Sequence, residues 1–132
     1  MGTRRIFFNR LAIDAQIGIL DHERGATQPL HVDAEIDLEG VDMPAHDGIQ
    51  EVLDYRRLRE CIIDECTRTH VNLIETLCDR LAARLLAQFP EIRDVRLRVA
   101  KPQAFADCAA VGIEVSATRA PGDGAQRHGA PT

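Results

Sequence analysis

Four polar residues in this sequence have the types and positions that acid–base chemistry requires. Glu23 lies in a segment rich in turn residues, and Glu75 lies in the first turn of a predicted helix. Tyr55 is the only tyrosine, and Lys101 is the only lysine among sixteen basic residues. A lysine with a tuned pKa can transfer a proton near neutral pH, whereas an arginine stays charged. The solitary lysine therefore indicates a general acid or base.

Each of these residues also has an ordinary structural explanation. Glu75 could complete a capping box with Asn72, and Tyr55 could cover the start of a helix. Glu23 and Lys101 could be solvated charges in a loop and at a strand end. From the pattern alone, the structural role is favoured for each.

Other kinds of catalytic site find little support in the sequence. The five histidines are scattered, with no metal-ligand spacing to one another or to the cysteines. Ser116 is the only serine and has no nucleophile signature around it. Neither common phosphate-binding glycine loop is present. The sequence therefore predicts no metal site and no cofactor.

Two apolar stretches early in the chain predict paired strands. Residues 5–18 alternate between apolar and polar, and the phase changes near Asn9 and Arg10, which predicts a bulge or bend. Residues 18–29 carry turn and charged residues typical of a loop. Residues 30–38 then alternate strictly, as in a half-buried strand. We expect the two strands to form a long antiparallel hairpin.

The period then changes from two to that of a helix. A first helix is predicted from Tyr55, and its apolar face ends before His70. A second helix follows, with Asn72 as its predicted N-cap and Pro90 as its end. Three of the four cysteines fall at core positions of these helices, so we expect buried, reduced thiols. The cysteines are Cys61, Cys66, Cys78 and Cys108.

Two further strands, at residues 92–101 and 110–118, complete the predicted order β-β-α-α-β-β. This order is typical of an α+β domain with a four-stranded antiparallel sheet and both helices on one face. Such a sheet has two open edges, which favours oligomerisation through the sheet. Residues 1–119 are predicted to form one domain. Residues 120–132 are rich in Gly, Pro and Ala and are predicted to be disordered.

Composition excludes several classes of function. The chain has 132 residues, a formal net charge of −5 and 4% aromatic residues without tryptophan, which disfavours nucleic-acid binding. No apolar run has the length of a membrane span, and the N-terminus lacks the pattern of a signal peptide. The expected location is the cytoplasm.

Four segments in order resemble the dihydroneopterin aldolase family. They are residues 17–24 (IGILDHER) followed by Gln28, residues 47–55 (DGIQEVLDY), residues 72–77 (NLIETL), and residues 99–104 (VAKPQA) with 110–113 (AVGI). The resemblance covers about residues 5–119. Phe105 and Glu51 stand where the family commonly has a smaller aliphatic residue and an aspartate.

The resemblance implies a tunnelling fold, in which subunits join their sheets into a barrel, as a tetramer or octamer with active sites between subunits. It also implies retro-aldol cleavage of 7,8-dihydroneopterin without a cofactor. Glu75, with the backbone near Leu73 and Ile74, would hold the pterin. Lys101 would be the general acid and base, Glu23 would bias its charge and contact substrate, and Tyr55 of a neighbouring subunit would help protonate the intermediate.

Three alternatives remain open from the sequence. A dihydroneopterin triphosphate epimerase would use the same residues, with extra basic residues such as Arg24 at the pocket mouth. Metal-dependent tunnelling-fold enzymes are disfavoured because the His/Cys constellation is missing. A non-catalytic pterin-binding relative is disfavoured because both Tyr55 and Lys101 are present.

Overall fold

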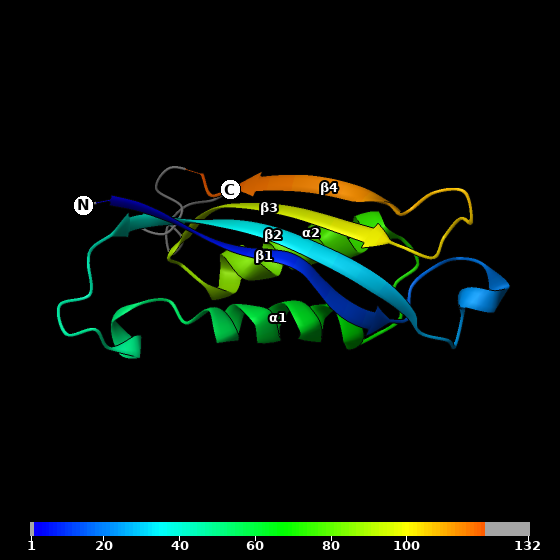
Figure 1. Cartoon of the computed structure of the whole chain (residues 1–132), viewed down its shortest axis with the longest axis horizontal. Coiled ribbons are helices and arrows are strands. Elements are labelled where there is room, and N and C mark those ends of the chain that lie inside the picture. The colour runs from blue at the N-terminus through cyan, green and yellow to red at the C-terminus, as the bar shows by residue number, and fades with distance from the viewer. Residues whose placement is uncertain (1, 121–132) are drawn as a thin grey trace.

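The computed structural model describes residues 2–120 and has the predicted order of elements (Figure 1). The strands are β1 (Gly2–Ala15), β2 (Gln28–Val41), β3 (Ile92–Lys101) and β4 (Val111–Thr118), and the helices are α1 (Tyr55–Thr67) and α2 (Ile74–Gln88). Two short 3-10 helices, η1 (Asp21–Glu23) and η2 (Ile49–Glu51), lie in the connections. Residues 121–132 of the segment predicted to be disordered lie outside the described part.

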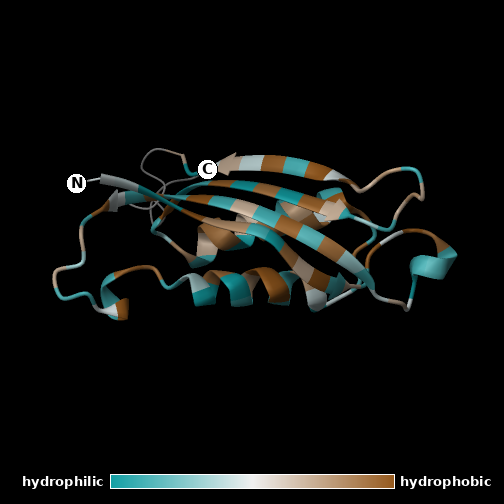
Figure 2. Cartoon of the chain, viewed as in Figure 1, coloured by the Kyte–Doolittle hydropathy of each residue, from teal (hydrophilic) through white to brown (hydrophobic). Residues whose placement is uncertain are grey.

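The strands form one antiparallel sheet in the order β1-β2-β3-β4, and both helices cover the same face. This confirms the predicted α+β arrangement. The strands carry alternating polar and apolar bands in Figure 2 because neighbouring side chains point to opposite faces. Apolar residues of β2 and β3 are buried in the core, where α2 packs against β3 and β4 and α1 packs against β1, and Phe89, directly after α2, is also buried there. No helix within residues 2–120 has the length and apolarity to cross a bilayer.

The face of the sheet away from the helices is charged. Cross-strand ion pairs on this face join Arg5 to Asp37, Glu35 to Arg96, and Arg98 to Glu114. Directly opposed residues of opposite charge stabilise a sheet modestly when they are solvated. The sheet therefore buries one face and leaves a polar second face.

The predicted irregularity in the first strand is confirmed as a bulge. The β1–β2 register shifts between Phe8 and Leu11, and Arg10 has a φ of 51°. Such a backbone leaves an amide without its ladder partner. The Asp33 carboxylate accepts a hydrogen bond from the Arg10 amide at 2.6 Å, so a side chain of β2 replaces the missing carbonyl.

The start of the second helix differs from the prediction. Asn72 is not the N-cap: Leu73 occupies that position, and no side chain caps the helix. The connector is held earlier by the residues just after β1, since the Val71 amide donates to the Gln16 carbonyl and the Val71 carbonyl accepts from the Gly18 amide. This pairing places Asn72 one residue too early to cap α2. The predicted capping box with Glu75 was therefore wrong.

The cysteine prediction is confirmed for the helical positions. Cys61, Cys66 and Cys78 are buried free thiols, and burial raises the pKa of each. Cys108 is exposed in the β3–β4 connection.

Candidate active site

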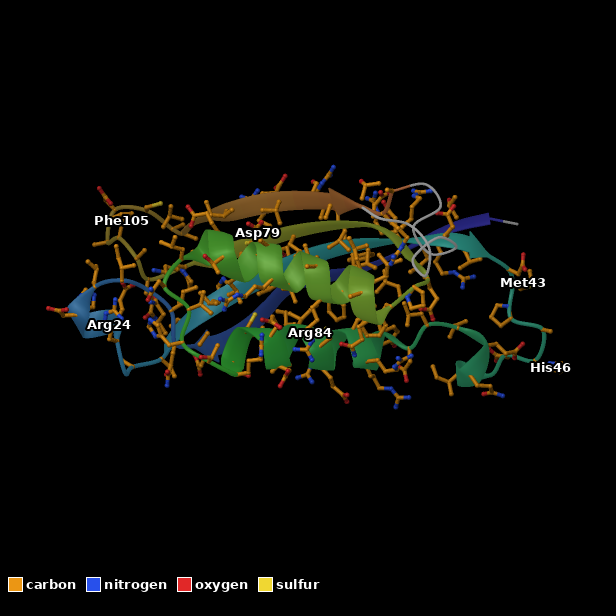
Figure 3. All side chains as sticks on the ribbon, turned by 180° about the vertical axis from the view of Figure 1, so that it is seen from behind. Arg24, Met43, His46, Asp79, Arg84 and Phe105 are labelled. Atoms are coloured by element: carbon orange, nitrogen blue, oxygen red, sulfur yellow. The ribbon has the colours of Figure 1, made fainter. Side chains whose placement is uncertain are left out.

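A cavity of about 640 Å³ opens where the β1–β2 loop meets the start of α2 and the β3–β4 connection. Its lining includes Glu23, Glu75 and Lys101, three of the four residues singled out in the sequence. Figure 3 shows Arg24 and Phe105, from the β1–β2 and β3–β4 connections, at the same end of the molecule. Chain segments far apart in sequence thus bring a lysine and two carboxylates to one cavity.

Lys101 and Glu23 form an ion pair inside this cavity. The Lys101 Nζ lies 2.9 Å from the Glu23 Oε2, and their side chains are only 16% and 12% exposed. Lys101 ends β3 and Glu23 ends η1, so the pair joins residues 78 positions apart. Limited water around the pair strengthens the attraction relative to a surface ion pair.

Two further donors hold the Glu23 carboxylate in place. The Gln28 amide donates both to Glu23 Oε2 at 3.0 Å and to the Ile17 carbonyl at 2.8 Å. The Leu20 backbone amide donates to Glu23 Oε1 at 3.1 Å. The hydrogen bond from Lys101, followed by that from Gln28, lowers the pKa of Glu23 from 4.5 to about 2. Glu23 is therefore an anion with a defined orientation.

Gly18 makes this arrangement sterically possible. Its φ is 127°, a conformation that residues with a Cβ rarely adopt. A Cβ at this position would overlap the Glu23 carboxylate. The glycine of the IG motif thus allows the chain to pass directly beside the carboxylate.

The second carboxylate of the cavity is available to a ligand. Glu75 is exposed in the first turn of α2, and no group within residues 2–120 hydrogen-bonds its carboxylate. Because the capping box is not formed, the structural explanation for Glu75 no longer applies. Leu73 and Ile74 precede it along the same wall.

The mouth of the cavity is apolar. Five of its lining residues are large exposed hydrophobics: Ile19, Leu20, Leu73, Phe105 and Val111. A cavity with apolar walls and a few convergent polar groups is typical of a small-molecule site. A flat ring could lie between these walls while its polar edge meets the carboxylates.

Tyr55 does not join the other three residues within one chain. It begins α1, is 63% exposed and does not line the cavity. In Figure 1 the start of α1, next to η2, lies at the opposite end of the molecule from the β1–β2 and β3–β4 connections. Within one chain, Tyr55 is therefore separated from Glu23, Glu75 and Lys101.

The segment before Tyr55 is nevertheless well organised. The Glu51 carboxylate accepts hydrogen bonds from the backbone amides of Ala45, His46 and Gly48, at 2.7 to 3.1 Å. These amides, with that of Gly48 the largest contributor, lower the pKa of Glu51. The Glu51 side chain thus closes the loop that precedes Tyr55.

The cavity contains few basic side chains within one chain. Its lining contains two carboxylates, one lysine and one histidine, His22, and it contains no arginine. Arg24, the basic residue considered for phosphate recognition, is not part of the lining. Within residues 2–120, no group of three or more His, Cys, Asp and Glu side chains is placed to hold a metal ion.

Sequence reasoning missed one contact of this site. In the sequence, His70 marks only the point where the apolar face of the first helix has ended, but its Nε2 lies 2.9 Å from the Gly18 carbonyl. No local pattern around His70 indicates this contact, because the two residues are 52 positions apart.

The depressed pKa of Glu23 predicts a pH dependence of stability. The anionic form stabilises the fold, so this contribution is complete above the ordinary pKa of 4.5 and is lost as the pH falls toward 2. The free energy of unfolding should fall over this interval in the wild-type protein, and less steeply in a Glu23→Gln variant. Urea denaturation at a series of pH values measures both slopes. A Glu91→Gln variant, which changes an exposed carboxylate, should keep the wild-type slope; equal slopes in all three proteins would contradict the prediction.

Comparison with known proteins identifies relatives of the chain. The family model of dihydroneopterin aldolase matches residues 6–116. A dihydroneopterin aldolase of Methylorubrum extorquens is 32% identical over 100 residues, which cover 76% of this chain and 77% of that protein.

Solved structures agree with this match. The Burkholderia thailendensis dihydroneopterin aldolase bound to guanine has a TM-score of 0.77 and 31% identity, with 89% of this chain and 92% of that chain covered. The Escherichia coli dihydroneopterin aldolase in complex with neopterin also has a TM-score of 0.77, with 26% identity and coverages of 86% and 98%.

Proposed function

The chain belongs to the dihydroneopterin aldolase family, and from this membership we propose that it cleaves 7,8-dihydroneopterin into 6-hydroxymethyl-7,8-dihydropterin and glycolaldehyde. The observation that carries the proposal is the ion pair of Lys101 and Glu23 in the same cavity as the unpaired carboxylate of Glu75. The ion pair supplies a group that can move protons, and the Glu75 carboxylate can hold a planar ring. We place this reaction in folate biosynthesis in the cytoplasm.

The substrate itself explains why so few groups suffice. Its dihydropterin ring has a C=N bond next to the side chain, so the electrons of the breaking C1′–C2′ bond can flow into the ring. The protein then needs to orient the ring and to move protons. A Schiff base with Lys101 is unnecessary, because the ring is the electron sink.

Glu75 is proposed to bind the ring. The 2-amino group and the neighbouring ring N–H of a pterin form a planar pair of donors, which matches the two oxygens of a carboxylate. Guanine presents the same pair of donors, and it is the ligand of the Burkholderia relative. The backbone of Leu73 and Ile74 lies beside Glu75 on the same wall and would contact the ring edge.

Lys101 is proposed to be the general base for the 2′-hydroxyl and then a general acid. A water molecule would carry the proton between Lys101 and the substrate. The cleavage step removes the hydroxyl proton as the C1′–C2′ bond breaks, and the resulting enamine must gain a proton at C1′. Glu23 would bias the charge of Lys101 and contact the substrate, in keeping with its 2.9 Å ion pair.

Tyr55 of a second subunit is proposed to complete the site and to help protonate C1′. Two observations support an assembly through the sheet: β1 and β4 are edge strands, and Tyr55 lies far from the cavity of its own chain. A closed ring of subunits removes the open edges. We propose a homo-oligomer, a tetramer or an octamer, whose barrel is lined by the charged sheet face.

The test is incubation of the purified protein with 7,8-dihydroneopterin and, separately, with its triphosphate, without added metal, followed by chromatography of the pterins. Release of 6-hydroxymethyl-7,8-dihydropterin from the unphosphorylated substrate is the expected result. Reaction of the triphosphate alone, with only its C2′ epimer formed, would instead identify an epimerase. Binding without turnover of either substrate would identify a non-catalytic pterin-binding protein.

A Glu75→Gln variant should bind guanine about 10- to 100-fold more weakly than the wild-type protein, because the substitution replaces one acceptor oxygen by an NH₂ donor and removes the charge. Isothermal titration calorimetry measures this change. Asp79→Asn is the matched control, since Asp79 is an exposed carboxylate of α2 outside the cavity (Figure 3). Equal guanine affinity of the Glu75→Gln and wild-type proteins would contradict the proposed role of Glu75.

A further inference from the structure

The cavity has two functional halves that come from different segments of the chain. The acid–base half contains Glu23 and Lys101, and the ring-binding half is the segment Asn72–Glu75, which leads into the first turn of α2. Proton transfer requires that the substrate side chain, fixed through its ring, lies within reach of Lys101. The rate of proton transfer therefore depends on the distance between the two halves, and the contacts that join the halves determine this distance.

The two halves meet at Gly18 and the residues just before Asn72. The Gly18 amide donates to the Val71 carbonyl at 3.0 Å, and the His70 Nε2 lies 2.9 Å from the Gly18 carbonyl. A carbonyl oxygen only accepts, so Nε2 carries the donated hydrogen; both the imidazolium and the Nε2–H tautomer can do this. Both polar groups of Gly18 are thus held by the connector, one by backbone and one by the half-buried His70 side chain.

Gly18 transmits this contact to the acid–base half. It lies so close to the Glu23 carboxylate that no Cβ fits between them, and Glu23 in turn holds Lys101. A shift or rotation of the Gly18 peptide therefore displaces Glu23. On the other side, His70 lies only two residues before Asn72, which lines the cavity.

We propose that His70 is a positioning residue that fixes the acid–base pair Glu23–Lys101 relative to the ring-binding segment Asn72–Glu75. The proposal rests on the proposed function, since it assumes that Lys101 moves protons on a ring held by Glu75. Loss of the His70 hydrogen bond leaves the ring-binding segment intact and loosens its spacing to Lys101. The rate of the chemical step should therefore fall, while the affinity for the ring should stay unchanged.

The test compares His70→Leu, which removes the donor, with His70→Gln, whose amide offers a donor at similar reach. Thr69→Val is the matched control, an exposed neighbour in the same connector. For His70→Leu we expect kcat for 7,8-dihydroneopterin to fall about 10-fold, since small misplacements of reacting groups are costly. KM and the Kd for guanine should stay within about 2-fold of wild type. His70→Gln should recover most of kcat, and Thr69→Val should match the wild-type protein.

Amide hydrogen exchange of residues 18–23 gives a readout that needs no activity. Exchange should be faster in His70→Leu and close to wild type in His70→Gln.

An unchanged kcat in His70→Leu, an equal loss of kcat in His70→Gln, or unchanged exchange in His70→Leu would overturn the proposal. If the leucine variant unfolds, His70→Asn, whose amide is too short to reach Gly18, takes its place. A wild-type protein without turnover would refute the proposed function instead, and the exchange experiment would still decide whether His70 holds Gly18.

Discussion

A Lys101→Ala variant is expected to cleave 7,8-dihydroneopterin about 10³-fold more slowly than the wild-type protein, within the range that a general acid–base group contributes. Lys101 is the only lysine, and its Nζ is held 2.9 Å from Glu23 in the cavity. Guanine binding should persist in this variant, because the proposed ring contact is Glu75. Steady-state kinetics and calorimetry on the same sample separate the two effects.

A Lys101→Arg variant distinguishes chemistry from electrostatics. Arginine keeps a positive charge beside Glu23 but does not release a proton near neutral pH. We therefore expect a folded protein that binds guanine and remains nearly inactive. Wild-type turnover in Lys101→Arg would reduce Lys101 to an electrostatic role, and turnover in Lys101→Ala would refute its role altogether.

A Tyr55→Phe variant is expected to lose about 10²-fold in turnover by itself, since it lacks the phenolic proton. Mixed with Lys101→Ala subunits, it should regain activity. The cavity holds Lys101 of one chain, while Tyr55 lies outside it in the same chain. In a random mixture of subunits in a ring, about a quarter of the interfaces would combine an intact Lys101 with an intact Tyr55.

The mixing experiment requires dissociation and reassembly of the two variants, followed by assay of the unphosphorylated substrate. The control mixes Tyr55→Phe with the double variant Tyr55→Phe, Lys101→Ala, in which no tyrosine is available and no activity should return. Absence of recovery in the first mixture, with reassembly verified by size, would show that Tyr55 does not act across a subunit interface.

Local patterns in the sequence were sufficient for the order and approximate bounds of the strands and helices. Apolar periods of two and 3.6 residues report which side of each element faces the core. The bulge near Arg10 was predictable for the same reason, because an extra residue reverses the alternation. The solitary Lys101 and the resemblance of four segments were also enough to nominate Glu23, Tyr55, Glu75 and Lys101.

Only the tertiary structure decided how these residues relate to one another. Pairing of Val71 with the segment just after β1 displaced the start of α2, which removed Asn72 from the cap and left Glu75 unpaired. The Glu23–Lys101 pair and the His70–Gly18 contact join residues 78 and 52 positions apart. Periodicity and capping patterns extend over a few residues, whereas these contacts depend on which distant backbones pair. The sequence alone therefore determined the elements and the candidate residues, and the pairing of distant segments determined the site.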